Sequence, residues 1–139
     1  MGFLQPYQPQ IYAVLRIIAG LMFMQHGLQK VFGLFGGRPD QMPAPMLWTA
    51  GLIELVGGAM IGIGLFAPAA AFVAAGMMAV AYFMVHQPQG LLPIVNRGEL
   101  AALYCWVFLL IAAKGSGVWS VDAARGTSSD GAGGTSPVA

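Results

Sequence analysis

The fold of this chain follows mainly from one stretch, residues 46–86, which reads MLWTAGLIELVGGAMIGIGLFAPAAAFVAAGMMAVAYFMVH. They contain two apolar runs, 46–66 and 69–86, which are separated only by Ala67-Pro68, and Glu54 is their one acidic or basic side chain apart from the terminal His86. Each run approaches the length of about 20 apolar residues that crosses a bilayer as a helix. Because the connection is very short, the two helices should lie antiparallel and side by side. The stretch therefore predicts a transmembrane hairpin with one carboxyl group inside it.

Two further apolar runs flank this hairpin, 11–33 before it and 97–113 after it. The last run would form a helix about 25 Å long, at the short end for crossing a hydrocarbon core of roughly 30 Å. After Arg125 the composition is Gly, Ser, Thr, Ala and Pro with almost no bulky side chains, which predicts disorder over 126–139. We expect an all-α integral membrane four-helix bundle over residues 1–125, followed by a disordered C-terminal tail.

The composition of the whole chain agrees with a membrane protein. Of its 139 residues, 58% are hydrophobic and 8% are charged, and the mean hydropathy is +0.73, whereas soluble domains carry about a quarter charged residues. The lipid bilayer is therefore the expected partner. Six Lys and Arg residues without a cluster exclude a nucleic-acid partner, because phosphate binding needs gathered cations. The single Cys105 excludes an internal disulfide.

Ionisable side chains inside the expected helices are the main functional signal, because each is costly in lipid unless it is paired or hydrated. Counting about 1.5 Å per residue along each helix places five of them in the half of the bundle near one membrane face. These are His26, Lys30, Glu54, His86 and Glu99. We expect them to form a ligand or proton site there.

Some of these residues also have simpler interpretations. Lys30 is expected to extend its ammonium group to the lipid headgroups. Asn96 followed by Glu99 resembles a capping box at the start of the last helix. His26 is a candidate partner of Glu54, and a purely structural role for such a pair is the alternative to a functional one. Glu54 itself is surrounded by glycine and aliphatic residues, so a function or a required ion pair is favoured there.

The chemistry of a carboxyl group beside an imidazole suits proton-coupled work, since such groups hydrogen-bond a quinone carbonyl or pass a proton. A quinone is the cofactor class that fits them, and no residue is assigned as catalytic. His26, His86 and Glu54 have no diagnostic metal spacing, so no metal site is assigned. Near the opposite face we expect a structural ion pair between Arg16 and Asp122, which would pin the segment after the last helix to the first helix.

Several motifs in this order and spacing resemble the DoxX family, and together they cover roughly Leu15 to Asp122. They are LRIIAG at 15–20, HGLQKVFG at 26–33, GLIELVGG at 51–58, NRGELA at 96–101 and GVWSVD at 117–122. The resemblance implies a multi-pass four-helix bundle in the bacterial cytoplasmic (inner) membrane. It also implies an association with redox systems, since family members include a thiosulfate:quinone oxidoreductase subunit and part of a membrane complex that handles oxidative stress. Many other members have no established activity.

Three functions follow from these observations. The first is a redox-associated membrane subunit, with Glu54 and His26 lining a quinone or small-molecule pocket near one membrane face. The second is a non-catalytic scaffold that binds a soluble redox enzyme through the loops after Gly33 and His86. The third is a small proton-coupled transporter that uses Glu54, for which a chain this short would need to form a homo-oligomer. Whether the chain is itself an enzyme stays open at this point.

Overall fold

The computed structural model describes residues 2–126, and every regular element in that range is helical. The tail expected to be disordered lies outside the described residues, apart from Gly126. A short 3-10 helix, η1 (Gly2–Tyr7), leads into α1 (Gln8–Phe32). The remaining elements, in chain order, are α2 (Ala44–Leu52), η2 (Ile53–Gly57), α3 (Gly58–Ile63), α4 (Ala67–Ala81), η3 (Tyr82–His86), η4 (Gln87–Gln89), α5 (Pro93–Asn96), α6 (Glu99–Lys114) and α7 (Val121–Ala124).

All four apolar runs are helical, with ends within about three residues of those expected from hydropathy. Within the described residues, three continuous helical stretches are long and apolar enough to cross a membrane: 2–32, 44–63 and 67–89. Many large apolar side chains on them are exposed, as lipid contact requires, including Ile18, Val56 and Phe72. The α6 helix has 16 residues and is shorter than these three stretches.

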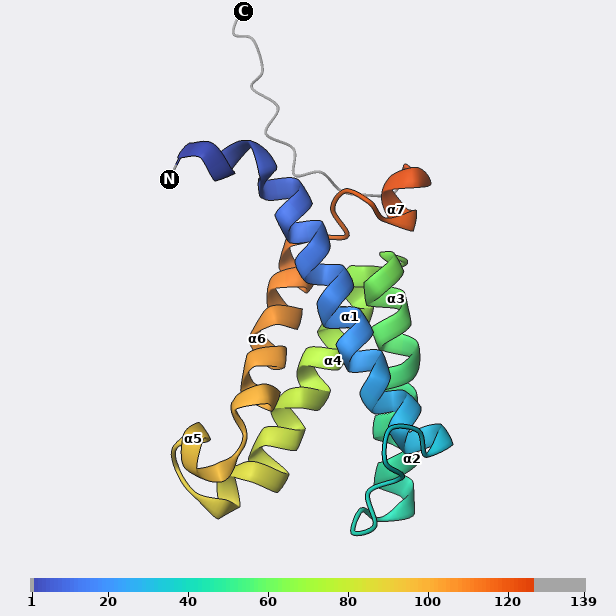
Figure 1. Cartoon of the computed structure of the whole chain (residues 1–139), viewed down its shortest axis with the longest axis vertical. Coiled ribbons are helices and arrows are strands. Elements are labelled where there is room, and N and C mark those ends of the chain that lie inside the picture. The colour runs from blue at the N-terminus through green and yellow to red at the C-terminus, as the bar shows by residue number, and fades with distance from the viewer. Residues whose placement is uncertain (1, 127–139) are drawn as a thin grey trace, which may run out of the picture.

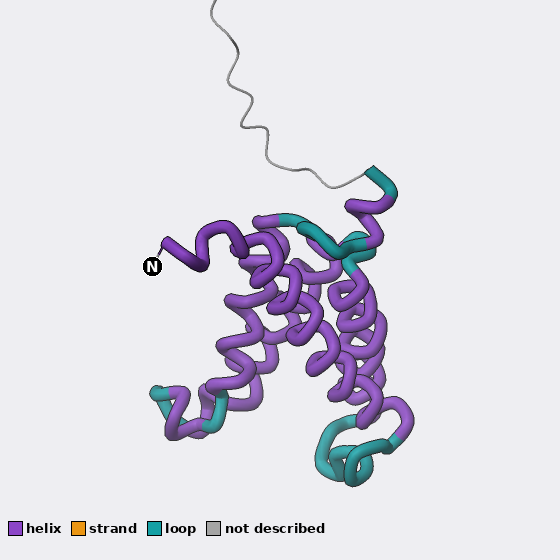
Figure 2. The backbone as a smooth tube through the Cα atoms, turned by 45° about the horizontal axis from the view of Figure 1, so that its top comes forward, coloured by secondary structure: helices purple, strands orange, loops and turns teal. Residues whose placement is uncertain are grey.

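The helices form two arms that meet at one end of the molecule and diverge at the other (Figures 1 and 2). One arm consists of α1 packed on α2, η2 and α3, and the other consists of α4 packed on α6. We call the end that carries α7 the closed end. The end that carries α5 and the loop 33–43 is called the open end.

Small residues explain the close packing within each arm. A Cβ atom added at Gly58 would lie 2.7 Å from the carbonyl oxygen of Gly20, so no larger residue fits where α1 crosses α3. In the other arm, Ala71 and Ala75, which are one turn apart on α4, are fully buried in the core with Phe108 of α6. Small residues therefore lie where the helices approach one another most closely in both arms.

The expected capping box at the start of α6 is wrong. The residue before the helix is Gly98, and no side chain caps it. Asn96 instead ends α5, where its Oδ1 accepts from the Gly98 amide (2.8 Å) and its Nδ2 donates to the Gly90 carbonyl (2.9 Å). Arg97 takes a left-handed conformation (φ 59°) between the two helices. Asn96 thus fastens the turn between η4 and α6 rather than extending the helix.

Candidate ligand pocket

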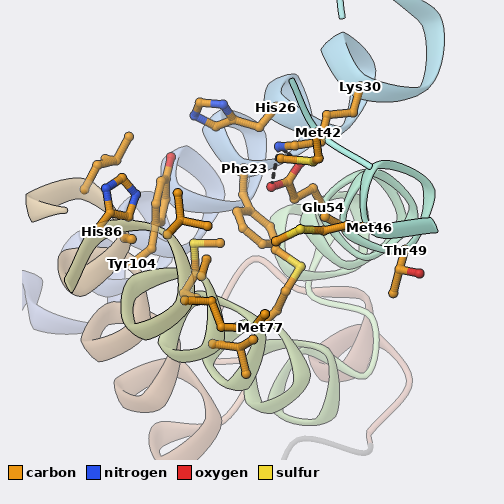
Figure 3. Close-up of a pocket in the computed structure, with 18 of the residues that line it drawn as sticks. Phe23, His26, Lys30, Met42, Met46, Thr49, Glu54, Met77, His86 and Tyr104 are labelled. Carbon is orange, nitrogen blue, oxygen red and sulfur yellow. Dashed lines mark hydrogen bonds and ion pairs between the residues drawn. The ribbon is translucent and has the colours of Figure 1, made fainter. Parts of the chain in front are cut away.

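A cavity of about 640 Å³ opens between the two arms, on the side of the open end (Figure 3). Its wall is built from α1, α2, η2, α4, η3 and α6, and most of it is apolar. Five methionines line it: Met42, Met46, Met77, Met78 and Met84. A largely apolar cavity with a few polar groups is typical of small-molecule sites. Methionine side chains are flexible and polarizable, so such a wall adapts to differently shaped ligands.

Four of the five candidate residues line this cavity, namely His26, Lys30, Glu54 and His86. They come from α1, η2 and η3, which are far apart in the sequence. Glu99, the fifth, is exposed at the start of α6 and is not part of the cavity wall, while Arg97 is. The helices that carry these four residues thus bring them together on the wall of one cavity between the arms.

Lys30 and Glu54 form an ion pair at the edge of the cavity (Figure 3). The Lys30 Nζ lies 2.7 Å from Oε1 and 2.6 Å from Oε2 of Glu54, and their side chains are only 11% and 5% exposed. The ammonium group therefore points to the carboxylate, not to lipid headgroups as expected. Glu54 has Lys30 rather than His26 as its partner. A charged pair with little water around it holds both side chains firmly in place.

Two π-helical turns border the cavity, and each carries a candidate residue. Glu54 lies in η2, and His86 is the last residue of η3. A π-helical turn takes up one extra residue, and such turns are rare and frequently occur at functional sites. The extra residue rotates the following helix by roughly 100° relative to regular geometry. The regular period of an α-helix does not predict a π-helical turn, and no feature of the sequence indicated these two.

The two imidazole groups occupy different settings. The Nδ1 of His86 lies 3.1 Å from the carbonyl oxygen of Asn96, and because a carbonyl only accepts, this nitrogen carries the proton. The Nε2 of a neutral His86 is then an acceptor. His26 stands edge-on to the ring of Tyr104, with ring centroids 6.5 Å apart. Tyr104 of α6 also lines the cavity, and no motif in the sequence marked it.

The closed end contains the other predicted pair, Arg16 and Asp122. Arg16 is completely buried, and its guanidinium donates to the carbonyl oxygens of Ser116 and Trp119, both at 2.8 Å. The Asp122 carboxylate accepts from the Ser116 hydroxyl and from the Phe66 amide at the start of α4. Both side chains thus fix the segment after α6 to the first arm and to the turn before α4. A direct ion pair between them stays a prediction.

No group of three or more His, Cys, Asp or Glu residues within the described range 2–126 is arranged to hold a metal ion. The donors at the cavity are mixed, with one carboxylate already bound to Lys30 and two imidazoles on separate helices. The polar side chains that this wall presents are able to form hydrogen bonds and to exchange protons.

Comparisons with known proteins agree with the motifs in the sequence. The DoxX family pattern matches residues 11–87, a range that contains His26, Lys30, Glu54 and His86. An uncharacterized protein of Haemophilus influenzae is 39% identical over 129 residues, which cover 88% of this chain and 96% of that protein. No solved structure matches. The match over more than half of the chain confirms the resemblance: this protein is a member of the DoxX family of membrane proteins.

Proposed function

We propose that this chain is a redox-associated membrane subunit that binds a quinone, or another flat molecule with similar polar groups, in the cavity between its two arms. The observation that carries the proposal is the composition of the cavity wall. A mainly apolar surface of about 640 Å³ is combined with the Lys30–Glu54 pair and the imidazoles of His26 and His86. This combination matches a ligand with an apolar ring and hydrogen-bonding oxygen atoms.

The proposal places the chain in the bacterial inner membrane with four crossings. The three long helical stretches supply three crossings, and we count α6 as the fourth. It packs along α4, and its outward residues Leu103, Trp106 and Leu110 are exposed. A row of exposed large apolar side chains along a helix marks a surface that contacts other apolar material, here the lipid. The polar loops then lie at the two membrane faces.

The shape of the molecule supports entry of the ligand from the bilayer. The arms diverge toward the open end (Figures 1 and 2), and the cavity lies between them. A ligand dissolved in the lipid can therefore reach the polar groups by moving sideways between α2 and the α4–α6 arm. Quinones with apolar tails are concentrated in the lipid. Lys30 then donates a hydrogen bond to a carbonyl oxygen, and His26 exchanges protons near it.

The test is quinone binding by the purified protein in lipid nanodiscs, with a short-chain benzoquinone and a dimethylnaphthoquinone as probes. Saturable binding is expected for the wild type. Glu54→Gln should weaken it by tenfold or more, because the pair that orients Lys30 is lost. Glu99→Gln is the matched control, since it makes the same change at an exposed carboxylate outside the cavity wall.

The outcomes separate the three functions. Absence of saturable binding by the wild type to both probes would refute a quinone site. Recovery of a soluble enzyme with the protein from native membranes, dependent on loop 33–43 and not on Glu54, would favour the scaffold. Proton flux through liposomes that contain this chain alone, abolished by Glu54→Gln, would favour the transporter.

A further inference from the structure

The hydroxyl group of Tyr104 is a buried donor that makes no hydrogen bond with any residue in the described part of the chain. The side chain is 5% exposed and projects from α6 into the space between the arms. Buried polar groups in folded proteins are nearly always hydrogen-bonded, and a buried group without a partner lowers stability. An unused donor in a cavity wall therefore calls for a partner from outside the chain.

The second buried tyrosine of the chain shows the usual situation. Tyr12 is 6% exposed at the closed end, and its hydroxyl donates to the carbonyl oxygen of Gly115 (2.5 Å). The two tyrosines are thus equally buried, but only the one at the closed end has an internal acceptor. The difference is one of location, because Tyr104 lies on the cavity.

The ring of Tyr104 is held in one orientation by aromatic neighbours. It stacks on Phe108, with centroids 5.3 Å apart and planes at 15°, and it contacts Phe23 at 5.6 Å. Figure 3 shows its hydroxyl end turned toward the side of the cavity where His26 and His86 lie. A ring clamped in this way cannot turn to seek another acceptor, so its donor is fixed in advance for an incoming atom.

We infer that Tyr104 is a recognition residue, whose hydroxyl donates a hydrogen bond to a carbonyl oxygen of a neutral, flat ligand in the cavity. This inference rests on the proposed function, in that the cavity is taken as the ligand site. The charges of Lys30 and Glu54 offset each other in the wall, and Arg97, which also lines the cavity, is exposed. A neutral carbonyl oxygen accepts from the Tyr104 hydroxyl without needing a counter-charge at this pair. The ring of Phe23 and the methionines supply apolar contact for the flat body of the ligand.

Neighbouring side chains bury the hydroxyl oxygen of Tyr104, so a ligand must displace one of them to reach it. The methionine side chains of the wall have several rotatable bonds and are suited to such a movement. Removing a hydroxyl that hydrogen-bonds only to a ligand should not lower the stability of the protein without ligand. Removing a hydroxyl that is hydrogen-bonded within the protein should lower that stability.

The experiment compares Tyr104→Phe with Tyr12→Phe, which remove the same atom at the two ends of the molecule. Three probes are titrated in nanodiscs: dimethylnaphthoquinone, the single-carbonyl ketone tetralone, and the hydrocarbon dimethylnaphthalene. Dimethylnaphthoquinone is chosen because its substituted ring does not add to Cys105. Tyr104→Phe should weaken binding of both carbonyl probes by about tenfold, as expected for one hydrogen bond, and leave the hydrocarbon unchanged. Its thermal midpoint without ligand should equal or exceed that of the wild type.

Tyr12→Phe should do the reverse, with a lower thermal midpoint and unchanged binding. Unchanged affinity of Tyr104→Phe for the quinone would refute the role of Tyr104 and leave the quinone site intact. Binding of tetralone that depends on Tyr104, without any binding of the quinone, would support the inference and refute the proposed function. If no probe binds the wild type, or if Tyr104→Phe unfolds as early as Tyr12→Phe, the inference is wrong.

Discussion

The closed and open ends of this molecule both bury charged side chains, but they use them differently. At the closed end, the Arg16 guanidinium donates to backbone carbonyls, and the Asp122 carboxylate accepts from a hydroxyl and a backbone amide. At the open end, Lys30 and Glu54 bind each other on the wall of a cavity. The closed end therefore uses charge to tie a loop to helices, and the open end keeps charge where a ligand can meet it.

This difference shows that the presence of a basic residue in a membrane helix does not by itself reveal what that residue does. Arginine and lysine each lie in α1, about four turns apart, and both are costly to bury. Arg16 can reach several carbonyl groups because its guanidinium presents five donors in a plane. Lys30 presents a compact charge, and it is matched by one carboxylate. The structural role of each cation therefore depends on the segment that lies beside it, and not on its charge.

The largest effect is expected from Glu54→Gln, which leaves the Lys30 ammonium group buried without its counter-charge. Breaking a buried pair in this way should lower the free energy of unfolding by roughly 3–5 kcal/mol, measured by SDS titration in mixed micelles. The double variant Lys30→Met with Glu54→Leu should recover most of the stability without recovering quinone binding. If the double variant stays as unstable as the single one, the pair is a structural tether, and the contrast between the two ends fails.

The next largest effect is expected at the closed end, from Gly64→Ala. Gly64 has a left-handed conformation (φ +73°), and an added Cβ would overlap Arg16 Nη1 and Ser120 Cβ. Overpacking together with backbone strain should lower the free energy of unfolding by about 3 kcal/mol. The control is Gly76→Ala in α4, where nothing lies within 4 Å of the added atom, and its stability should rise slightly because alanine favours helices. Quinone affinity of the folded fraction should be unaffected by either variant.

A smaller loss is expected from Asp122→Asn. This carboxylate caps the amide of Phe66 at the start of α4 and binds the Ser116 hydroxyl. Replacing a charged acceptor with a neutral one should cost about 1–2 kcal/mol, seen as a lower thermal midpoint in detergent. A double-mutant cycle with Arg16→Met then tests the direct ion pair, because coupled residues give a non-additive result. Unchanged thermal stability of Asp122→Asn would rule out both the pair and the cap.

The smallest effect is expected from acid. The hydrogen bond from the Ser116 hydroxyl holds the pKa of Asp122 below its ordinary value of 3.8. A lowered pKa means that this carboxylate adds stability above about pH 4, and that the gain is lost as the pH falls through the folded-state value. The thermal midpoint of the wild type should therefore fall more steeply than that of Asp122→Asn as the pH is lowered from about 5 to about 2. If the thermal midpoints of the two proteins fall in parallel with pH, the Asp122 carboxylate makes no pH-dependent contribution to stability.

Hydropathy and the positions of glycine and proline were enough to locate the helices. A membrane-spanning helix needs a long apolar run, and glycine or proline marks where the helix ends. The depth of each ionisable residue from one membrane face was also accessible, since helix rise is constant. Of the five residues that this depth groups, His26, Lys30, Glu54 and His86 line one cavity, whereas Glu99 is exposed outside its wall. Depth along a helix says nothing about the direction in which a side chain points.

The residues alone were enough to identify an all-helical membrane protein of the DoxX family. Only the tertiary structure decided which of its polar groups meet. The π-helical turns at Glu54 and His86 change the rotation of their helices. The divergence of the arms leaves a cavity, into which Tyr104 brings an unused donor. Such contacts depend on how helices are rotated and tilted against one another, and that is set by packing over the whole bundle rather than by any local pattern.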